Sequence, residues 1–260
     1  MSNIFQEPNG TDLFWYSRPI ALQRKWWGGE PIWRTLQKAA IHTGAVFWPG
    51  SEVPTLTPDR YLRYAEDADR LTSTARVNRI LEWLRLPKAE RPRFICAYFS
   101  LVDSAGHMYG PESSAVNYTI AEIDRAIGLL DAKLQAAELW QNVTLLVVSD
   151  HGMSGATKTR KIVLDDIFDL ARARVDERGP IATITPKYAN ETEAIYTALE
   201  EASGRLGHFQ VYYRETIPAK WHYRDNLRIA PIVVVADPVL FSSTTKLNKT
   251  GSRLKKRDGV

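Results

Sequence analysis

Apolar residues in this chain gather in short runs that alternate with amphipathic stretches. The runs FICAYFSLV at 94–102 and TLLVVS at 144–149 are too short for helices. The second run is rich in β-branched residues, so we expect both runs to be strands buried in a parallel sheet. Further strands are expected at 181–184, 209–213 and 232–235.

The longest amphipathic stretch lies at 112–139. Apolar residues recur there at alternating spacings of four and three, at Val116, Ile120, Ile123, Ile127, Leu130 and Leu134. This spacing predicts a helix with one apolar face, which packs on the sheet and connects the two strands. A shorter helix is expected to begin at Pro31 and to end before Gly44. Further short helices are expected at 75–86, 163–173 and 191–202.

The alternation of strand and helix patterns is typical of a doubly wound α/β fold, in which helices cover both faces of a mostly parallel sheet. Neither a repeat nor a linker interrupts the 260 residues, of which 44% are hydrophobic and 25% charged. A chain of this length and composition can bury a sizeable core. One domain spanning 1–260 is therefore expected.

Charge and cysteine content exclude several classes of protein. The net charge is only +4, and the one dense basic cluster, Lys255-Lys256-Arg257, lies among polar residues near the end of the sequence. We interpret it as a solvated segment and expect no nucleic-acid surface. The single cysteine, Cys96, lies within an expected buried strand. It therefore excludes an internal disulfide and a cysteine-based zinc site.

Asparagine spacing points to the secretory pathway. Five of the eight asparagines begin an Asn-x-Thr triplet: Asn9, Asn117, Asn142, Asn190 and Asn248. Chance spacing would give roughly one, so we expect a glycosylated protein, with coincidence in a threonine-rich sequence as the alternative. The first residues contain no signal peptide, and no membrane span follows. Either the triplets mislead, or the protein begins upstream of this chain.

Two acid–imidazole pairs carry the candidate chemistry. Asp103 directly follows the first run, and His107 comes four residues later. Asp150 and His151 directly follow the second run. Strands of a parallel sheet present their carboxyl ends at one edge, so we expect the pairs to meet. Carboxylate and neutral imidazole are ordinary zinc ligands, and Gly106 would allow the turn that brings His107 back to Asp103. Two metals can clamp a phosphate between them.

The alternative for either pair alone is a helix cap with a surface imidazole. Two pairs, each after an apolar run and joined by one amphipathic helix, favour a metal site. Three histidines have no acidic neighbour at a strand end, and we interpret them as structural: His42, His208 and His222.

Longer segments carry a family resemblance. The segments LVDSAGHMYGP, GLLDAKL and LLVVSDHGM, with WWGGEPIW, VFWPGSEV and WHYRDNLRIAPIVVVADP around them, cover nearly the whole chain. In this order they resemble the nucleotide pyrophosphatase/phosphodiesterase family of the alkaline phosphatase superfamily. The resemblance implies an alkaline phosphatase-like fold and a two-zinc enzyme. Such an enzyme cleaves phosphodiester and pyrophosphate bonds of nucleotides and releases nucleoside monophosphates through a covalent threonine intermediate.

The resemblance also assigns residues. Asp103 and His107 look like ligands of one zinc ion, and Asp150 and His151 like ligands of the other. Tyr98 matches a family position that faces the substrate pocket. Tyr64 matches the tyrosine that stacks on the nucleotide base.

The family pattern is incomplete here at both ends. Its zinc-binding aspartate, threonine nucleophile and phosphate-binding asparagine would lie upstream of Met1, and a histidine in a His-Gly-Tyr motif beyond Val260. We therefore expect a fragment with no catalytic nucleophile, weakened zinc binding and no activity alone. A missing internal strand would leave an apolar edge, so poor solubility is expected.

Two other functions stay open. The chain could be a non-catalytic relative that binds a nucleotide or a partner through the retained pocket, or another hydrolase or mutase of the superfamily. WWGGEPIW and WPGSEV favour the nucleotide-cleaving branch. The expected ligand is a nucleotide or another small phosphodiester, and the parent protein is expected to be secreted or a membrane-anchored ectodomain.

Overall fold

The computed structural model describes residues 3–8, 10, 12–64, 71–155, 161–237 and 241–243, the last three by their backbone alone. The chain divides into two compact units. One is Ser17–Gly155, and the other combines Met1–Tyr16 with Ala156–Val260. The expectation of a single domain over 1–260 stays a prediction.

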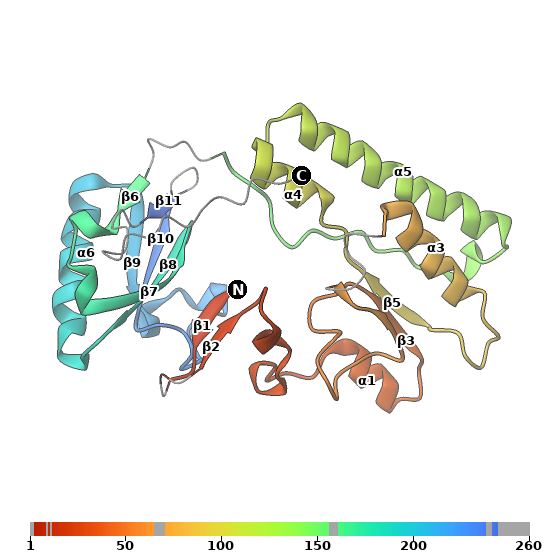
Figure 1. Ribbon diagram of the computed structural model, residues 1–260, viewed down its shortest axis with the longest axis horizontal. Helices are drawn as coiled ribbons and strands as arrows, with labels where there is room; N and C mark the ends of the chain where they lie inside the picture. Colours follow the sequence, from red (N-terminus) through yellow and green to blue (C-terminus); the bar gives the residue numbers. More distant parts are fainter. Residues whose placement is uncertain are drawn as a thin grey trace. The chain divides into compact units, whose positions relative to one another are not determined.

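The unit Ser17–Gly155 is built on a three-stranded parallel sheet with the order β4-β3-β5. Figure 1 labels two of its strands, β3 and β5. Its strands are β3 (Thr43–Val46), β4 (Arg60–Leu62) and β5 (Phe94–Ala97). All four residues of the central strand β3 are buried. A side chain at Gly44 would begin 2.9 Å from the Trp83 ring, so glycine is required for the helix that carries Trp83 to approach the sheet.

Helices cover both faces of this sheet. They are α1 (Ile32–Lys38), α3 (Ser73–Leu84) and α5 (Ser114–Ala136), and α4 (Leu101–Tyr109) packs on α5. The unit also contains the 3₁₀ turns η1 (Pro19–Leu22), η2 (Arg24–Trp26) and η3 (Trp140–Asn142). Trp33 of α1 packs against Ala45 and Cys96 on one face. On the other face α3 and α5 enclose a core with Val46, Phe47, Val77, Ile80, Leu81, Trp83, Ala126, Leu130 and Leu134. This is the doubly wound arrangement that the sequence predicts.

Capping side chains set where the two long helices begin. The Thr72 hydroxyl accepts a hydrogen bond from the Ala75 amide at 3.2 Å, and the Ser113 hydroxyl accepts one from Val116 at 3.3 Å. Each bond satisfies an amide that has no partner within its own helix. The expected helices at 75–86 and 112–139 are therefore confirmed. The first lies two residues earlier than expected and the second is shorter at both ends, whereas the helix expected from Pro31 is only two turns long.

The expected strand at 144–149 is wrong. Residues 143–149 run without secondary structure, and no described residue forms a ladder with them. The side chains of Leu146, Val147 and Val148 are 79%, 69% and 76% exposed. A β-branched run favours a pleated surface only when a neighbouring strand bonds its backbone, and the described residues supply none. The expected strand at 94–102 is real but ends at Ala97, and α4 follows.

The other unit contains an antiparallel sheet, which the alternation of patterns did not predict. Its order is β7-β8-β10-β9, formed by β7 (Ala173–Arg178), β8 (Ile181–Pro186), β9 (Phe209–Tyr213) and β10 (Ile232–Ala236). Helix α6 (Thr192–Leu206) packs on it through Ile195 and Leu199. A hairpin of β1 (Ile4–Gln6) and β2 (Leu13–Trp15) and a parallel pair of β6 (Lys161–Val163) and β11 (Phe241–Ser243) complete the strands described.

The three strands and the last helix predicted for this unit are confirmed, but the helix predicted at 163–173 is wrong. The segment forms two 3₁₀ turns, η4 (Leu164–Asp166) and η5 (Leu170–Arg172), and then enters β7. The Asp169 carboxylate accepts a hydrogen bond from the Ala171 amide at 2.9 Å. Such a local bond competes with a continuous helix. Further 3₁₀ turns are η6 (Ala189–Glu191), η7 (Arg214–Thr216) and η8 (Ala219–Trp221).

Candidate functional site

The first acid–imidazole pair lies on a helix. Asp103 is in the first turn of α4 and His107 in its last, with Nε2 of His107 3.3 Å from Oδ1 of Asp103. Residues four apart are neighbours on a helix surface, so the helix itself brings the two side chains together. The turn that we expected Gly106 to supply is therefore not needed, and that interpretation is wrong.

Gly106 has a different role. It is buried within α4, and a methyl group in its place would overlap the Met153 sulfur. The segment DHGM thus packs directly on the segment DSAGH. The two motifs, 43 or more residues apart in sequence, meet at this contact between Gly106 and Met153.

The second pair lies in an irregular segment on the surface. Nε2 of His151 is 3.7 Å from Oδ2 of Asp150, and the other oxygen of Asp150 accepts the His151 backbone amide at 3.0 Å. Nδ1 of His151 is 2.9 Å from the Gly152 carbonyl. A carbonyl can only accept, so this contact assigns the proton to Nδ1 and leaves the Nε2 lone pair available for a metal. Ser149 donates to the His151 carbonyl at 2.7 Å and adds a second local constraint.

These residues fit zinc in the type of donor but not in number. Among the described residues there is no group of three or more His, Cys, Asp or Glu side chains that could hold a metal ion. Each pair alone offers two protein ligands, whereas a catalytic zinc site has three.

Tyr98 and Tyr64 lie at the same edge of the sheet. Tyr98 follows β5, and its amide donates to the Val46 carbonyl at the end of β3, at 2.9 Å. Tyr64 follows β4, and its backbone amide donates to the Glu52 carboxylate at 2.8 Å. Its ring, 47% exposed, stands edge-on to Phe47, with centroids 6.0 Å apart. The carboxyl ends of the parallel strands thus present an aromatic surface, as expected of a ligand site in such a sheet.

Arg76 joins the ends of β3 and β5, and no sequence pattern had singled it out. It is only 6% exposed, and its guanidinium donates to the Tyr98 carbonyl at 2.8 Å and to the Leu71 carbonyl at 3.1 Å. The same group lies over the Phe47 ring, 4.6 Å from its centroid. An arginine on the apolar face of a predicted helix was the signal that could have revealed it.

One further histidine has an acidic neighbour. Nδ1 of His42 is 3.9 Å from the Asp59 carboxylate, which also accepts bonds from the Thr43 backbone amide and hydroxyl at 2.8 and 2.9 Å. This cluster lies at the amino end of β3. It is therefore at the opposite end of the strands from Tyr98.

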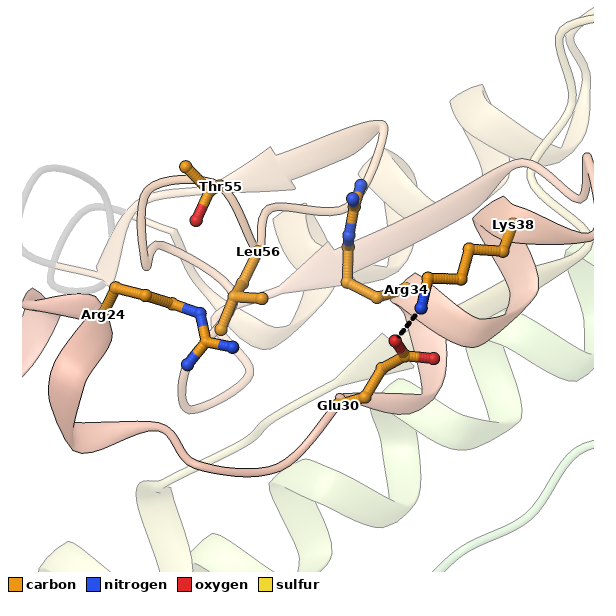
Figure 2. Close-up of a pocket in the computed structure, with 6 residues that line it drawn as sticks. All are labelled: Arg24, Glu30, Arg34, Lys38, Thr55 and Leu56. Atoms are coloured by element: carbon orange, nitrogen blue, oxygen red, sulfur yellow. Dashed lines mark hydrogen bonds and ion pairs between the residues drawn. The ribbon is translucent and has the colours of Figure 1, made fainter.

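Two cavities lie elsewhere in the described residues. A cavity of about 270 Å³ is lined by Arg24, Glu30, Arg34, Lys38, Thr55 and Leu56 (Figure 2). In Figure 2 Arg34 and Lys38 project from α1, and Lys38 pairs with Glu30. Hydrogen bonds from Lys38 and Thr35 lower the pKa of Glu30, so its carboxylate stays charged. A second cavity, of about 290 Å³, lies in the other unit beside Glu7 and Arg228. None of the six predicted site residues lines either cavity.

The unit Ser17–Gly155 thus combines a parallel sheet, aromatic side chains after its strand ends, and two acid–imidazole pairs whose segments meet where Met153 packs on Gly106. The family described as type I phosphodiesterase / nucleotide pyrophosphatase matches residues 1–260, and the chain belongs to this family.

Relatives support this assignment. The chain is 35% identical over 217 residues to the bis(5'-adenosyl)-triphosphatase enpp4 of Xenopus laevis, covering 82% of this chain and 46% of that protein. It is 36% identical over 214 residues to ectonucleotide pyrophosphatase/phosphodiesterase family member 5 of Homo sapiens, covering 82% and 43%. The chain thus spans less than half the length of these two relatives.

Solved structures show the same fold. Murine ectonucleotide pyrophosphatase/phosphodiesterase 5 matches with a TM-score of 0.82 and 33% identity, over 94% of this chain and 64% of that one. An inactive variant of the murine protein in complex with AMP matches with a TM-score of 0.80. The predicted α/β fold of the alkaline phosphatase type is therefore confirmed. The roles of the six site residues stay predictions.

Proposed function

We propose that this chain is part of a metal-dependent hydrolase that cleaves phosphodiester and pyrophosphate bonds of nucleotides and releases nucleoside monophosphates. The observation that carries the proposal is the packing of Met153 on Gly106, which joins the two acid–imidazole motifs. Membership of a nucleotide pyrophosphatase/phosphodiesterase family supports it.

Two zinc ions are the proposed cofactors, one held by Asp103 and His107 and one by Asp150 and His151. When bound, zinc would neutralise charge on the phosphoryl oxygens. The residues of this chain hold and orient the ligands: α4 fixes the spacing of the first pair, and the Gly152 carbonyl fixes the tautomer of His151. With two protein ligands per ion, binding by this chain alone should be weak.

The proposed substrate is a nucleotide. Tyr64 offers an exposed ring on which a base can stack, and Phe47 supports that ring from its edge. Tyr98 would line the same pocket. The AMP bound to a murine relative of the same fold supports this class of ligand.

A second function is a nucleotide-binding protein without catalysis. It is favoured by the lack of any three-residue metal cluster among the described residues. We propose that the isolated 260-residue chain can bind a nucleotide in this way.

We also propose that the parent protein acts outside the cytosol, as a secreted or membrane-anchored protein. Relatives include an ectonucleotide enzyme of Homo sapiens and the venom phosphodiesterase of Macrovipera lebetinus, 33% identical over 232 residues. In the part of the chain that the structure describes, no helix is long and apolar enough to cross a membrane.

Hydrolysis of a chromogenic nucleotide phosphodiester tests the proposal. We expect zinc-dependent turnover by the intact parent protein, loss of turnover with a chelator, and no turnover by the 260-residue chain. Loss of a residue that only hydrogen-bonds to a metal ligand lowers metal affinity roughly 10–100-fold. Asp103→Ala and Asp150→Ala each remove a proposed ligand itself, so each should lower zinc affinity by more than this.

The matched control is Asp124→Ala, which removes an exposed carboxylate from α5 and should change nothing. Full turnover by Asp103→Ala in the intact protein would refute the metal assignment. Zinc-dependent turnover by the 260-residue chain would show that it carries a nucleophile of its own.

A further inference from the structure

The Asn-x-Thr triplets that the structure describes have exposed asparagines. Three of the five fall on described residues, and Asn117, Asn142 and Asn190 are all exposed. Asn9 and Asn248 lie outside the described residues. An N-linked glycan is larger than the side chain that carries it, so only an exposed asparagine can hold one in a folded protein. We propose that Asn117, Asn142 and Asn190 are N-glycosylated.

The three triplet asparagines differ from two other asparagines in the hydrogen bonds that their side chains make. Asn78 and Asn226 do not begin a triplet, and each uses its Oδ1 within the fold: Asn78 accepts from Lys133 at 3.1 Å, and Asn226 from the Arg228 amide at 2.9 Å. The carboxamides of the three triplet asparagines make no such bond to the described residues. A sugar can therefore be attached to them without the loss of a native side-chain contact.

The backbone at each site tolerates the sugar as well. Asn117 is in the first turn of α5, Asn142 is the last residue of η3, and Asn190 is in η6 just before α6. Glycosylation uses the side-chain nitrogen only. The backbone bonds of these turns, such as that from the Asn117 amide to the Ser113 carbonyl at 3.3 Å, stay intact.

The reaction needs a sugar donor and transferase of the secretory pathway. Nδ2 of the asparagine loses one proton to solvent and forms a bond to the anomeric carbon of an oligosaccharide carried on a polyprenyl diphosphate. The bond between that carbon and the diphosphate oxygen breaks, and the polyprenyl diphosphate leaves with the electron pair. No oxidant or reductant takes part.

The test is peptide mapping of the full protein isolated from its host. An amidase that removes N-glycans converts each glycosylated asparagine to aspartate, and in heavy-oxygen water the new carboxylate is labelled. We expect label in the peptides that contain Asn117, Asn142 and Asn190. The peptides with Asn78 and Asn226 serve as internal controls and should carry none.

Variants of one site separate glycosylation from spontaneous deamidation. Asn142→Gln and Thr144→Ala should each remove the mass of one glycan, because each destroys the triplet, whereas Thr144→Ser should retain it. Thr144 is exposed, so these changes do not disturb the core. Recovery of any of the three peptides only in unmodified form would overturn the proposal for that site, and unmodified peptides at all three would overturn it entirely.

Discussion

Replacing Gly106 with alanine tests whether the two motifs are packed together as the structure shows. Within a helix, alanine is more favourable than glycine by about 1 kcal/mol. The new methyl group would overlap the Met153 sulfur, and overpacking typically costs about 1–3 kcal/mol. The clash should outweigh the helix propensity, so we expect Gly106→Ala to lower the free energy of unfolding by up to about 2 kcal/mol.

A double-mutant cycle with Met153→Ala isolates this contact. When Met153 is truncated, the clash is absent, and Gly106→Ala should then raise the stability by about 1 kcal/mol. The coupling energy between the two positions should therefore be about 1–3 kcal/mol, measured by urea unfolding of the 260-residue chain. Gly128→Ala is the matched control, because it lies in α5 with no atom within 4 Å of the new methyl group.

One result would refute the reasoning. If Gly106→Ala stabilises the chain as much as Gly128→Ala, the side chain of Met153 moves aside freely, and the contact does not fix the two motifs. In the intact protein the same substitution should weaken zinc binding, because it displaces the segment that carries Asp150 and His151.

Three further predictions follow from buried or exposed groups. Arg76→Met should lower the free energy of unfolding by about 3 kcal/mol, because it removes two charge-assisted hydrogen bonds from a buried site, whereas Arg79→Met, at an exposed position, should change it by less than about 0.5 kcal/mol; equal effects would exclude a special role for Arg76. Burial acts to raise the pKa of Asp59, but hydrogen bonds from Thr43 outweigh it and leave the pKa below its usual value. The stability from this carboxylate is therefore present above about pH 4 and lost as the pH falls through the lower folded pKa, and Asp59→Asn should flatten that part of the urea-unfolding profile measured against pH. Val147→Lys should reduce light scattering by the concentrated 260-residue chain at a cost in stability of less than about 0.5 kcal/mol, because Val147 is 69% exposed; unchanged scattering would mean that the apolar run does not drive association.

Local patterns predicted the elements whose stability comes from their own sequence and a single apolar face. The helix α5 was found from its apolar periodicity at 112–139, whereas its limits, Ser114–Ala136, were not predicted. The strands β8, β9 and β10 were found because each pairs with neighbours that the structure describes. The spacing of Asp103 and His107 was recognised as chemistry, but not as the geometry of a helix.

The helix expected at 163–173 fails for a local reason, the bond from the Ala171 amide to Asp169, but the other failures come from tertiary contacts. The run at 144–149 has the composition of a strand, yet a strand exists only through the partner that bonds its backbone, and no pattern within the run reveals whether that partner is present. The contacts of Gly106 and Arg76 are also tertiary. An arginine on the apolar face of a predicted helix marked position 76 as unusual, whereas Gly106 was expected to form a turn. Neither residue reveals its partner.

The run at 144–149, which forms no ladder with a described residue, also bears on how the second acid–imidazole pair is held. Asp103 and His107 are fixed by the hydrogen bonds of α4, whereas Asp150 and His151 depend on bonds within 149–152 and on the packing of Met153. Catalytic groups must be held to within about 0.5 Å, which short-range bonds on an exposed segment do not provide. A strand bonded along 144–149 would fix Asp150 as the Tyr98 amide bond to Val46 fixes the end of β5. If a neighbouring strand bonds the backbone of 144–149, zinc affinity at Asp150 and His151 should rise far more than zinc affinity at Asp103 and His107. Measuring the two affinities separately would therefore distinguish the two sites.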